Sequence, residues 1–167
     1  MSTETNWNEA PMSQLVDYII TKHHVYSYAE LDLISELLTW HVRNYWLKFP
    51  VLLQAHTLFH QVKAAFEQHM IQEETAGFPM IKAAEKDSTK SLAPFVKTIT
   101  HHEEAHEHAI STLRKVKETL WNGEPPAEIG PEVATTITLI SNLIADLAEH
   151  IRLENDILFP RARALQA

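Results

Sequence analysis

The hydrophobic residues of this chain recur at helical spacing along four long stretches. In each stretch, apolar side chains stand three and four residues apart, which lines one face of an α-helix and predicts packing against a core. Four long helices joined by short turns are typical of an all-α, antiparallel up-down-up-down four-helix bundle. We therefore expect one domain over residues 1–167. The predicted helices span about 13–45, 50–85, 91–121 and 131–164.

Proline, glycine and capping residues mark where these helices begin and end. No Gly or Pro interrupts the chain from Ser13 to Tyr45, and Ser13 is a suitable N-cap. Pro50 fits the first turn of the second helix, in which Gly77 and Pro79 predict a kink. The later breaks are a polar segment over 86–90 and a Gly- and Pro-containing segment over 122–126.

One phrase of the sequence occurs twice. HMIQEETAGFP over 69–79 and HIRLENDILFP over 150–160 each place a Glu four residues after a His, with a Phe-Pro pair further on. Positions i and i+4 share one face of a helix, so each phrase directs an imidazole and a carboxylate the same way. The Phe-Pro pairs most simply end their helices with an apolar anchor. The paired residues are His69 with Glu73 and His150 with Glu154.

The spacing of four histidines fits a single level of such a bundle. Residues that meet on antiparallel neighbours lie at equal distances from the turn between them. The midpoint of His24 and His69 falls at 46–47, beside the first predicted turn. The midpoint of His69 and His102 falls at 85–86, and that of His102 and His150 at 126, again at predicted turns. The four side chains are therefore expected at one height on successive helices, each on an apolar stripe.

Buried carboxylates supply the second argument for a metal site. Glu73 and Glu154 lie on the apolar stripes, where a charge is very costly unless it is paired or coordinates a metal. His106, four residues after His102, adds an imidazole on the same face. Five imidazoles and two carboxylates are too many for one four-coordinate zinc and suit two ions bridged by the carboxylates. The candidate ligands are His24, His69, Glu73, His102, His106, His150 and Glu154.

The two halves of the chain differ at one position of this set. If the first and last pairs of helices are copies of one hairpin, the residue that corresponds to His106 is Tyr28. One ion then has three imidazoles and the other two. The poorer ion keeps an open position for a small ligand, and we expect that position to face Tyr28.

The remaining histidines have simpler explanations. His56 and His60 form a second pair at i and i+4, but they are half a turn out of phase with the cluster, on a charged face. His23 precedes His24, and a slip in register would exchange them; the apolar stripe favours His24. His41 lies about 25 Å along the helix from His24, too far to join the cluster.

Composition narrows the class of protein. The chain has 167 residues, 45% hydrophobic and 22% charged, which is ordinary for a globular domain, so its eleven His are the unusual feature. A formal net charge of −8 argues against nucleic acid as a partner. The chain has no Cys, which excludes disulfides, thiolate zinc sites and Cys-ligated clusters. No secretory signal or membrane span is recognisable, so we expect a cytoplasmic protein without a membrane partner.

These residues resemble the hemerythrin-like (HHE cation-binding) superfamily, and within it the di-iron proteins that repair damaged iron–sulfur centres. The similarity covers nearly the whole chain and is most specific from His150 to Ala162. The resemblance implies a non-haem di-iron centre in a four-helix bundle, with bridging carboxylates at Glu73 and Glu154. Other shared residues are Trp7, Pro11, Leu15, His23, Met70, Glu74, Phe78, Pro79 and the segment His102-Glu103-Glu104-Ala105. The residues that match the family's His ligands are His24, His69, His102 and His150.

The chain departs from the repair proteins at two positions. They usually have a further ligand His before the first turn, where this chain has Tyr45, and a small residue where it has His106. The pair of His102 and His106 is similar instead to that of oxygen-carrying hemerythrins. The resemblance thus implies handling of iron, or of O2 or NO, in nitrosative or oxidative stress, with an apo iron–sulfur protein as acceptor. The alternatives are an O2 or NO carrier or sensor without turnover, and a di-iron oxidase or peroxidase; manganese or zinc in place of iron stays open.

Overall fold

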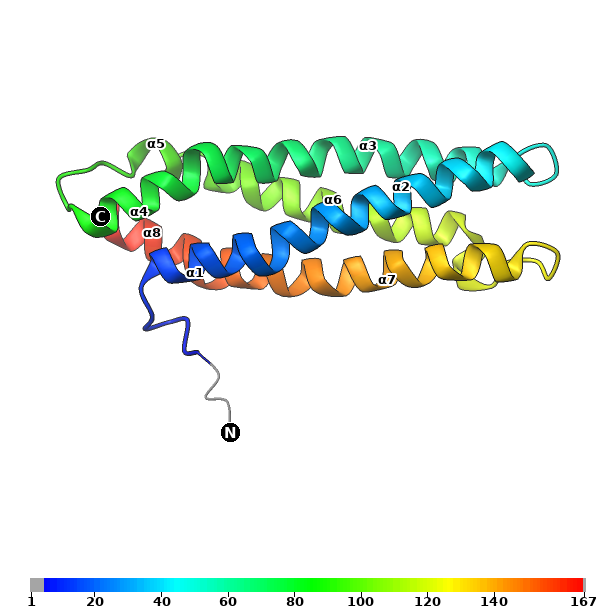
Figure 1. The fold of residues 1–167 in the computed structure, drawn as a ribbon. Helices are drawn as coiled ribbons and strands as arrows, with labels where there is room; N and C mark the ends of the chain where they lie inside the picture. Colours follow the sequence, from blue (N-terminus) through cyan, green and yellow to red (C-terminus); the bar gives the residue numbers. More distant parts are fainter. Residues whose placement is uncertain (1–4, 167) are drawn as a thin grey trace.

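Four helical rods run antiparallel to one another and form an elongated bundle (Figure 1). The structure is a computed structural model and describes residues 5–166; the ends of the predicted domain, 1–4 and 167, lie outside the described residues. The first rod comprises α1 (Met12–Tyr18), η1 (Ile19–His24) and α2 (Val25–Tyr45). The second comprises α3 (Val51–Gln72), η2 (Glu73–Gly77) and α4 (Phe78–Lys86). The third comprises α5 (Ala93–Val96) and α6 (Ile99–Thr119), and the fourth α7 (Gly130–Arg152), η4 (Leu153–Leu158) and α8 (Phe159–Gln166).

The predicted four-helix bundle is confirmed. The helices α2, α3, α6 and α7 contact one another in that order around the bundle, and α7 closes the ring against α2. The first, second and fourth rods begin and end within two residues of the predicted bounds. A single-turn helix η3 (Trp121–Gly123) follows α6 in the loop that leads to α7.

The third rod is the exception, because the sequence predicts one helix over 91–121 and the structure divides it. Thr98 closes a tight turn in which its backbone N–H and its hydroxyl donate to the carbonyl of Phe95, at 2.8 and 2.7 Å. Such local bonds compete with the helical ladder and separate α5 from α6. The ring of Phe95 packs against Gly77 of the second rod, where an added Cβ atom would lie 2.6 Å from the ring. The missing side chain of Gly77 therefore allows α5 to approach.

Three rods contain a π-helical segment at the same level of the bundle. The segment η1 ends at His24, η2 begins at Glu73, and η4 contains Glu154. The backbone N–H of Phe78 bonds to the carbonyl of Glu73, and that of Phe159 to the carbonyl of Glu154, each five residues back. Single π turns inside α-helices are frequent at functional sites.

The Phe-Pro pairs of the doubled phrase explain two of these segments. Pro79 and Pro160 have no backbone N–H, so the ordinary α-helical ladder cannot pass through them unchanged. The expectation that the pairs end their helices is wrong, because the rods continue to Lys86 and Gln166. The pairs instead follow a wide turn and bury Phe78 and Phe159 in the core. The doubled phrase thus encodes a π turn, which places Glu73 and Glu154 on its first residues.

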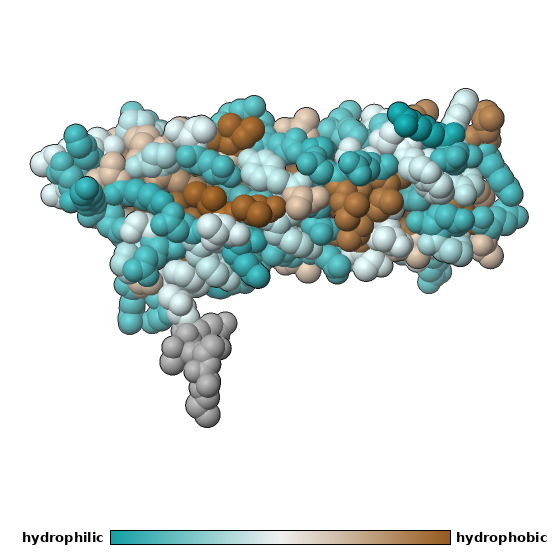
Figure 2. Space-filling model, viewed as in Figure 1, coloured by the Kyte–Doolittle hydropathy of each residue, from teal (hydrophilic) through white to brown (hydrophobic). Residues whose placement is uncertain are grey.

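The core consists of two apolar clusters with a polar layer between them. The larger cluster joins α2, α3, α6 and α7, and the smaller joins α1, α4, α5, η4 and α8. Apart from His41, near the far end of α2, the buried His and Glu side chains lie on the segments that connect the two clusters. Figure 2 shows that one outer face is mainly hydrophilic, with separate apolar patches. Within residues 5–166, the helices are too short or too polar to cross a membrane.

Candidate metal centre

The seven side chains proposed from the sequence as metal ligands lie together in the polar layer. All seven are at most 5% exposed, although a Glu side chain is almost never fully buried unless it is paired. They come from all four rods, so the site depends on the whole bundle. They form two overlapping groups, which we call the His24 nest and the His106 nest after one member of each.

The His24 nest consists of His24, His150, Glu73 and Glu154, whose ligand atoms lie within 4.8 Å of one another. Nε2 of His24 lies 3.2 Å from Nε2 of His150 and 3.6 Å from a carboxylate oxygen of Glu73. Nε2 of His150 lies 3.0 Å from Oε1 of Glu154. Two imidazole nitrogens that face each other so closely repel unless a proton or a cation lies between them.

The His106 nest consists of His69, His106 and the same two carboxylates. Nε2 of His69 lies 2.8 Å from Nε2 of His106, which in turn lies 3.0 Å from Oε2 of Glu154. His102 lies beside this nest, with Nδ1 3.3 Å from Oε1 of Glu73 and 3.3 Å from Nδ1 of His69. Three imidazoles are therefore near one position and two near the other, and Glu73 and Glu154 are common to both.

The two nests correspond to each other when the halves of the chain are exchanged. His24 corresponds to His106, His69 to His150, and Glu73 to Glu154. This corrects the equivalence of His106 with Tyr28 that the sequence suggested. The extra imidazole of the second half is His102, one turn before His106. The corresponding turn before His24 carries the apolar Ile19 and Ile20, and the π segment η1 shifts the register there.

Tyr28 therefore does not stand where an imidazole is missing. It lies one turn after His24 and packs partly buried against the larger apolar cluster. Burial and the negative charge of Glu74 raise the pKa of Tyr28 to about 12, so its hydroxyl stays protonated. Its proximity to an open metal position stays a prediction.

The electrostatics of the cluster keep both carboxylates ionised. Burial and the charge of Glu154 raise the pKa of Glu73, but the imidazoles of His102 and His69 outweigh them and hold it at about 2. Burial also raises the pKa of Glu154, and its imidazole neighbours hold it well below the usual range. Burial lowers the pKa of His106, yet Glu154 outweighs this and leaves it raised. Two buried negative charges thus attract positive charge into the layer.

The donor atoms fit a pair of first-row metal ions. Both carboxylate oxygens of Glu73, one of Glu154 and Nδ1 of His150 are buried without a well-aligned hydrogen bond. Buried polar atoms are normally paired, so this group of unpaired atoms in one layer indicates a ligand. Imidazole nitrogen and carboxylate oxygen together suit iron, manganese or zinc.

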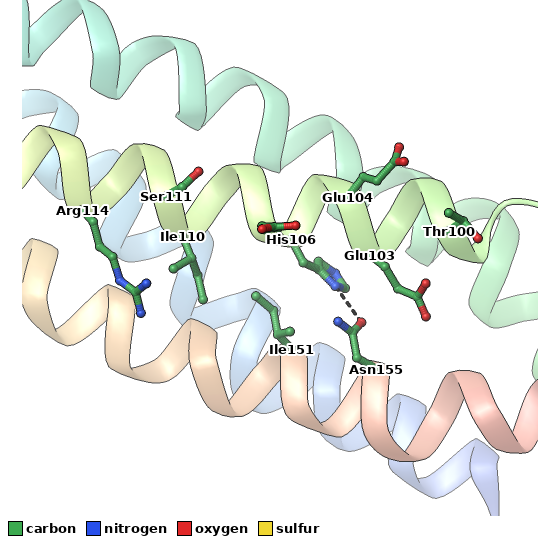
Figure 3. Close-up of a pocket in the computed structure, with 10 residues that line it drawn as sticks. Thr100, Glu103, Glu104, His106, Ile110, Ser111, Arg114, Ile151 and Asn155 are labelled. Atoms are coloured by element: carbon green, nitrogen blue, oxygen red, sulfur yellow. Dashed lines mark hydrogen bonds between the residues drawn. The ribbon is translucent and has the colours of Figure 1, made fainter.

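A second set of contacts orients two of the imidazoles and was not recognised from the sequence. Nδ1 of His24 donates to Oε1 of Glu74 at 2.8 Å. Nδ1 of His106 donates to Oδ1 of Asn155 at 3.0 Å (Figure 3). Both bonds leave Nε2 free to face the carboxylates. The signal in the sequence was present, because Glu74 and Asn155 each follow directly after a predicted carboxylate ligand.

The other aromatic and histidine candidates lie outside the two nests. His23 is buried with Nδ1 3.1 Å from Asp146, and its ring stacks on that of His150 with centroids 5.7 Å apart. Tyr45, at the distal end of α2, contacts the ring of Trp40. His41 bonds to Thr136 at 2.8 Å. His56 and His60 were not expected to bind metal. His56 bonds to Thr39 at 3.1 Å, and His60 bonds to Ser35 at 2.9 Å.

Two surface pockets reach imidazoles of the second half. One, of about 550 Å³, lies between α6 and the fourth rod and is lined by His106, Asn155 and three glutamates (Figure 3). The other, of about 380 Å³, is lined by His102 and mainly apolar side chains, among them Phe95 and Met80. A polar and an apolar approach therefore both lead toward the His106 nest.

Comparison with known proteins agrees with this geometry. The pattern of the hemerythrin HHE cation-binding domain matches residues 15–162, which include every residue of both nests. The iron–sulfur cluster repair protein YtfE of Escherichia coli O81 (strain ED1a) is 34% identical over 164 residues, or 96% of this chain and 70% of that protein. The proteins of the same name from Escherichia coli O1:K1 / APEC and Escherichia fergusonii are 33% identical with the same coverage.

Proposed function

Because the chain belongs to the hemerythrin HHE cation-binding family, we propose that it is a single hemerythrin-like domain that binds two iron ions, one in each nest. The observation that carries this is the pair of nests, each with facing imidazole nitrogens and both sharing the ionised Glu73 and Glu154. Iron is favoured over manganese and zinc by the family. A non-haem iron pair supplies reversible electron transfer and positions at which O2 or NO binds.

The protein handles iron, or NO or O2, in nitrosative or oxidative stress. The similarity to proteins named for iron–sulfur cluster repair supports an apo iron–sulfur protein as the acceptor of iron. The residues of the bundle hold the ions and exclude bulk water, since all of the proposed ligands are buried. The acidic pocket beside His106 suits the passage of a cation. A cytoplasmic location stays a prediction from the sequence.

An O2 or NO carrier or sensor without turnover is the second candidate. His106 favours it, because this imidazole lies within the cluster although the repair proteins usually have a small residue there. The apolar pocket beside His102 suits a small uncharged ligand.

Metal analysis of the purified protein tests the core of the proposal. We expect about two irons per chain, together with the loss of both in Glu73→Ala, because that carboxylate belongs to both nests. The matched control is His101→Ala, which removes an exposed imidazole one residue from His102 and should leave the iron content unchanged. A wild-type protein that binds no transition metal when loaded anaerobically would contradict the proposal.

A transfer experiment separates the two functions. The iron-loaded protein is incubated anaerobically with an apo iron–sulfur protein, and the iron in both partners is measured after separation. A repair protein loses iron to the acceptor, whereas a carrier retains its iron and binds and releases NO or O2 over repeated cycles. Sustained turnover with a reductant would point instead to an oxidase or peroxidase.

A further inference from the structure

The two nests are alike in their imidazoles and carboxylates but differ in the groups behind them. In the first half, His24 donates to the carboxylate of Glu74. At the corresponding position of the second half, His106 donates to the neutral amide of Asn155 (Figure 3). The exchange of halves that relates the ligands thus also relates Glu74 to Asn155, with one negative charge of difference.

The difference continues one layer outward. Tyr28, one turn after His24, lies beside Glu74, and burial together with the negative charge of that carboxylate raises the pKa of its hydroxyl. Ile110, one turn after His106, lies in the corresponding place and lines the pocket that contains Asn155. In the first half, the Glu74 carboxylate that accepts from His24 therefore also has the Tyr28 hydroxyl nearby. The second half has one bond, from His106 to Asn155, with an apolar neighbour.

We propose that Glu74 and Asn155 are positioning residues that make the two metal positions unequal. A carboxylate that accepts the Nδ1 hydrogen raises the basicity of the imidazole and strengthens its bond to a metal more than a neutral amide does. Glu74 thus compensates for the missing third imidazole of the His24 nest. Tyr28 acts on the metal position indirectly, because its hydroxyl draws away part of the negative charge of Glu74. This role differs from the one predicted from the sequence, in which Tyr28 faces an open metal position.

The burial of the contacts supports this role. His24 is fully buried, and Glu74 is partly exposed, so the bond lies at the edge of the dry layer where its strength is only partly reduced by water. Glu74 lies on η2, which begins with the shared ligand Glu73. The same π turn therefore holds both carboxylates. A change at Glu74 should therefore act on the ion of the His24 nest and leave the other ion nearly unchanged.

Stepwise metal affinities test the inference, which rests on the proposed binding of two ions. The probe is Fe²⁺ added anaerobically in competition with a chelator of known affinity, with full-length wild-type protein and three variants. Glu74→Gln should weaken one of the two sites by about 10–100-fold. Asn155→Asp should strengthen the other site by about tenfold or more, and Tyr28→Phe should strengthen the site that Glu74→Gln weakens.

The control for charge alone is Glu36→Gln. This residue is exposed on α2, twelve residues and about 18 Å along the helix from His24, so neither affinity should change. A reductive titration of the iron-loaded protein gives a second readout: Glu74→Gln should move one of its two one-electron steps to higher potential and leave the other in place. A structural role would instead weaken both sites together and lower the thermal stability of the metal-free protein.

The outcomes are distinguishable. Equal weakening of both sites in Glu74→Gln, or no change in either, would overturn the inference while leaving two-ion binding intact. A wild-type protein that binds fewer than two ions would overturn the proposed function instead.

Discussion

His102 and His106 illustrate how similar residues differ in their contribution to one site. His106 faces His69 across 2.8 Å and completes a nest, whereas His102 lies beside that nest at 3.3 Å from Glu73. The sequence placed both on the same apolar stripe and predicted that His106 is the imidazole without a counterpart in the first half of the chain. The symmetry of the nests makes His102 the additional imidazole.

A pair of variants tests this assignment. His106→Leu should abolish binding of one ion, because it leaves the His106 nest with one facing imidazole. His102→Leu should keep two ions and weaken one of them by more than the roughly 10–100-fold typical of outer hydrogen-bonding partners. Metal content and stepwise affinity are the measurements. If the loss is greater in His102→Leu, the assignment is reversed.

His41 is a buried histidine at the far end of the bundle, about 25 Å from the nests along its helix. It is 1% exposed, bonds to Thr136 through Nε2, and has no partner for Nδ1. Burial lowers its pKa below 6.5, and the nearby Glu132 offsets this only in part. In the unfolded chain the same side chain takes up a proton at about pH 6.5, so acid favours unfolding.

The pH dependence of stability tests this effect of His41. The contribution of His41 to the free energy of unfolding of the metal-free protein should be greatest above about pH 6.5 and should fall as the pH decreases toward the lowered pKa of His41. The decrease is at most about 1.4 kcal/mol for each pH unit over which the folded chain keeps this imidazole neutral. His41→Gln can keep a bond to Thr136 and should show a smaller decrease between about pH 7.5 and pH 5, on either side of the usual His pKa. Urea unfolding at several pH values measures the difference, and parallel curves for the two proteins would show that His41 does not contribute.

At the scale of elements, the position of the short helix α5 depends on the lack of a side chain at Gly77. A Cβ atom at Gly77 would lie 2.6 Å from Phe95, so Gly77→Ala must displace the ring or the helix. Alanine gains about 1 kcal/mol of helix propensity over glycine, while overpacking of a core usually costs about 1–3 kcal/mol. The overpacking should therefore determine the sign, and the variant should be less stable.

A rescue variant and a control accompany Gly77→Ala. Gly77→Ala combined with Phe95→Leu should recover part of the loss, because the smaller side chain makes room. Gly130→Ala is the control, since its new Cβ atom would lie 3.9 Å from the nearest carbonyl. Thermal unfolding followed by circular dichroism measures all three. A Gly77→Ala variant as stable as the wild type would show that the contact is readily relieved.

The π segments are the elements that bring the ligands to one level. Glu73 and Glu154 each begin or enter a wide turn, and the Pro that follows each turn prevents an ordinary α-helical ladder. The third rod has no such segment among its described residues and instead breaks at Thr98, before His102. Each rod thus departs from regular geometry close to the site.

At the scale of the whole molecule, bound ions should connect all four rods. The metal-free protein should stay helical, because the apolar clusters on both sides of the polar layer do not involve the ligands. Metal that binds only the folded state adds about 2.7 kcal/mol at a free concentration about 100 times the Kd. The melting temperature should therefore rise on loading and fall again with a chelator. Glu73→Ala should show no such metal-dependent change.

The sequence by itself determined the four helices, their approximate bounds and the set of side chains at one level. It could do so because helical periodicity and turn residues are local features of the sequence. In addition, residues of two antiparallel helices that are equally far along the chain from the turn between them lie at the same level of the bundle. The same logic selected His24 over His23 and set His41 and the pair of His56 and His60 apart from the cluster.

Only the tertiary structure decided how these side chains are divided and oriented. The correspondence of His24 with His106, the bonds to Glu74 and Asn155, and the approach of α5 to Gly77 all depend on contacts between rods. A π turn changes the register by a fraction of a turn, which spacing counted on regular helices cannot detect. The ring orientations of His24 and His106 depend in turn on the acceptor behind Nδ1, and the bundle brings that acceptor from a different rod.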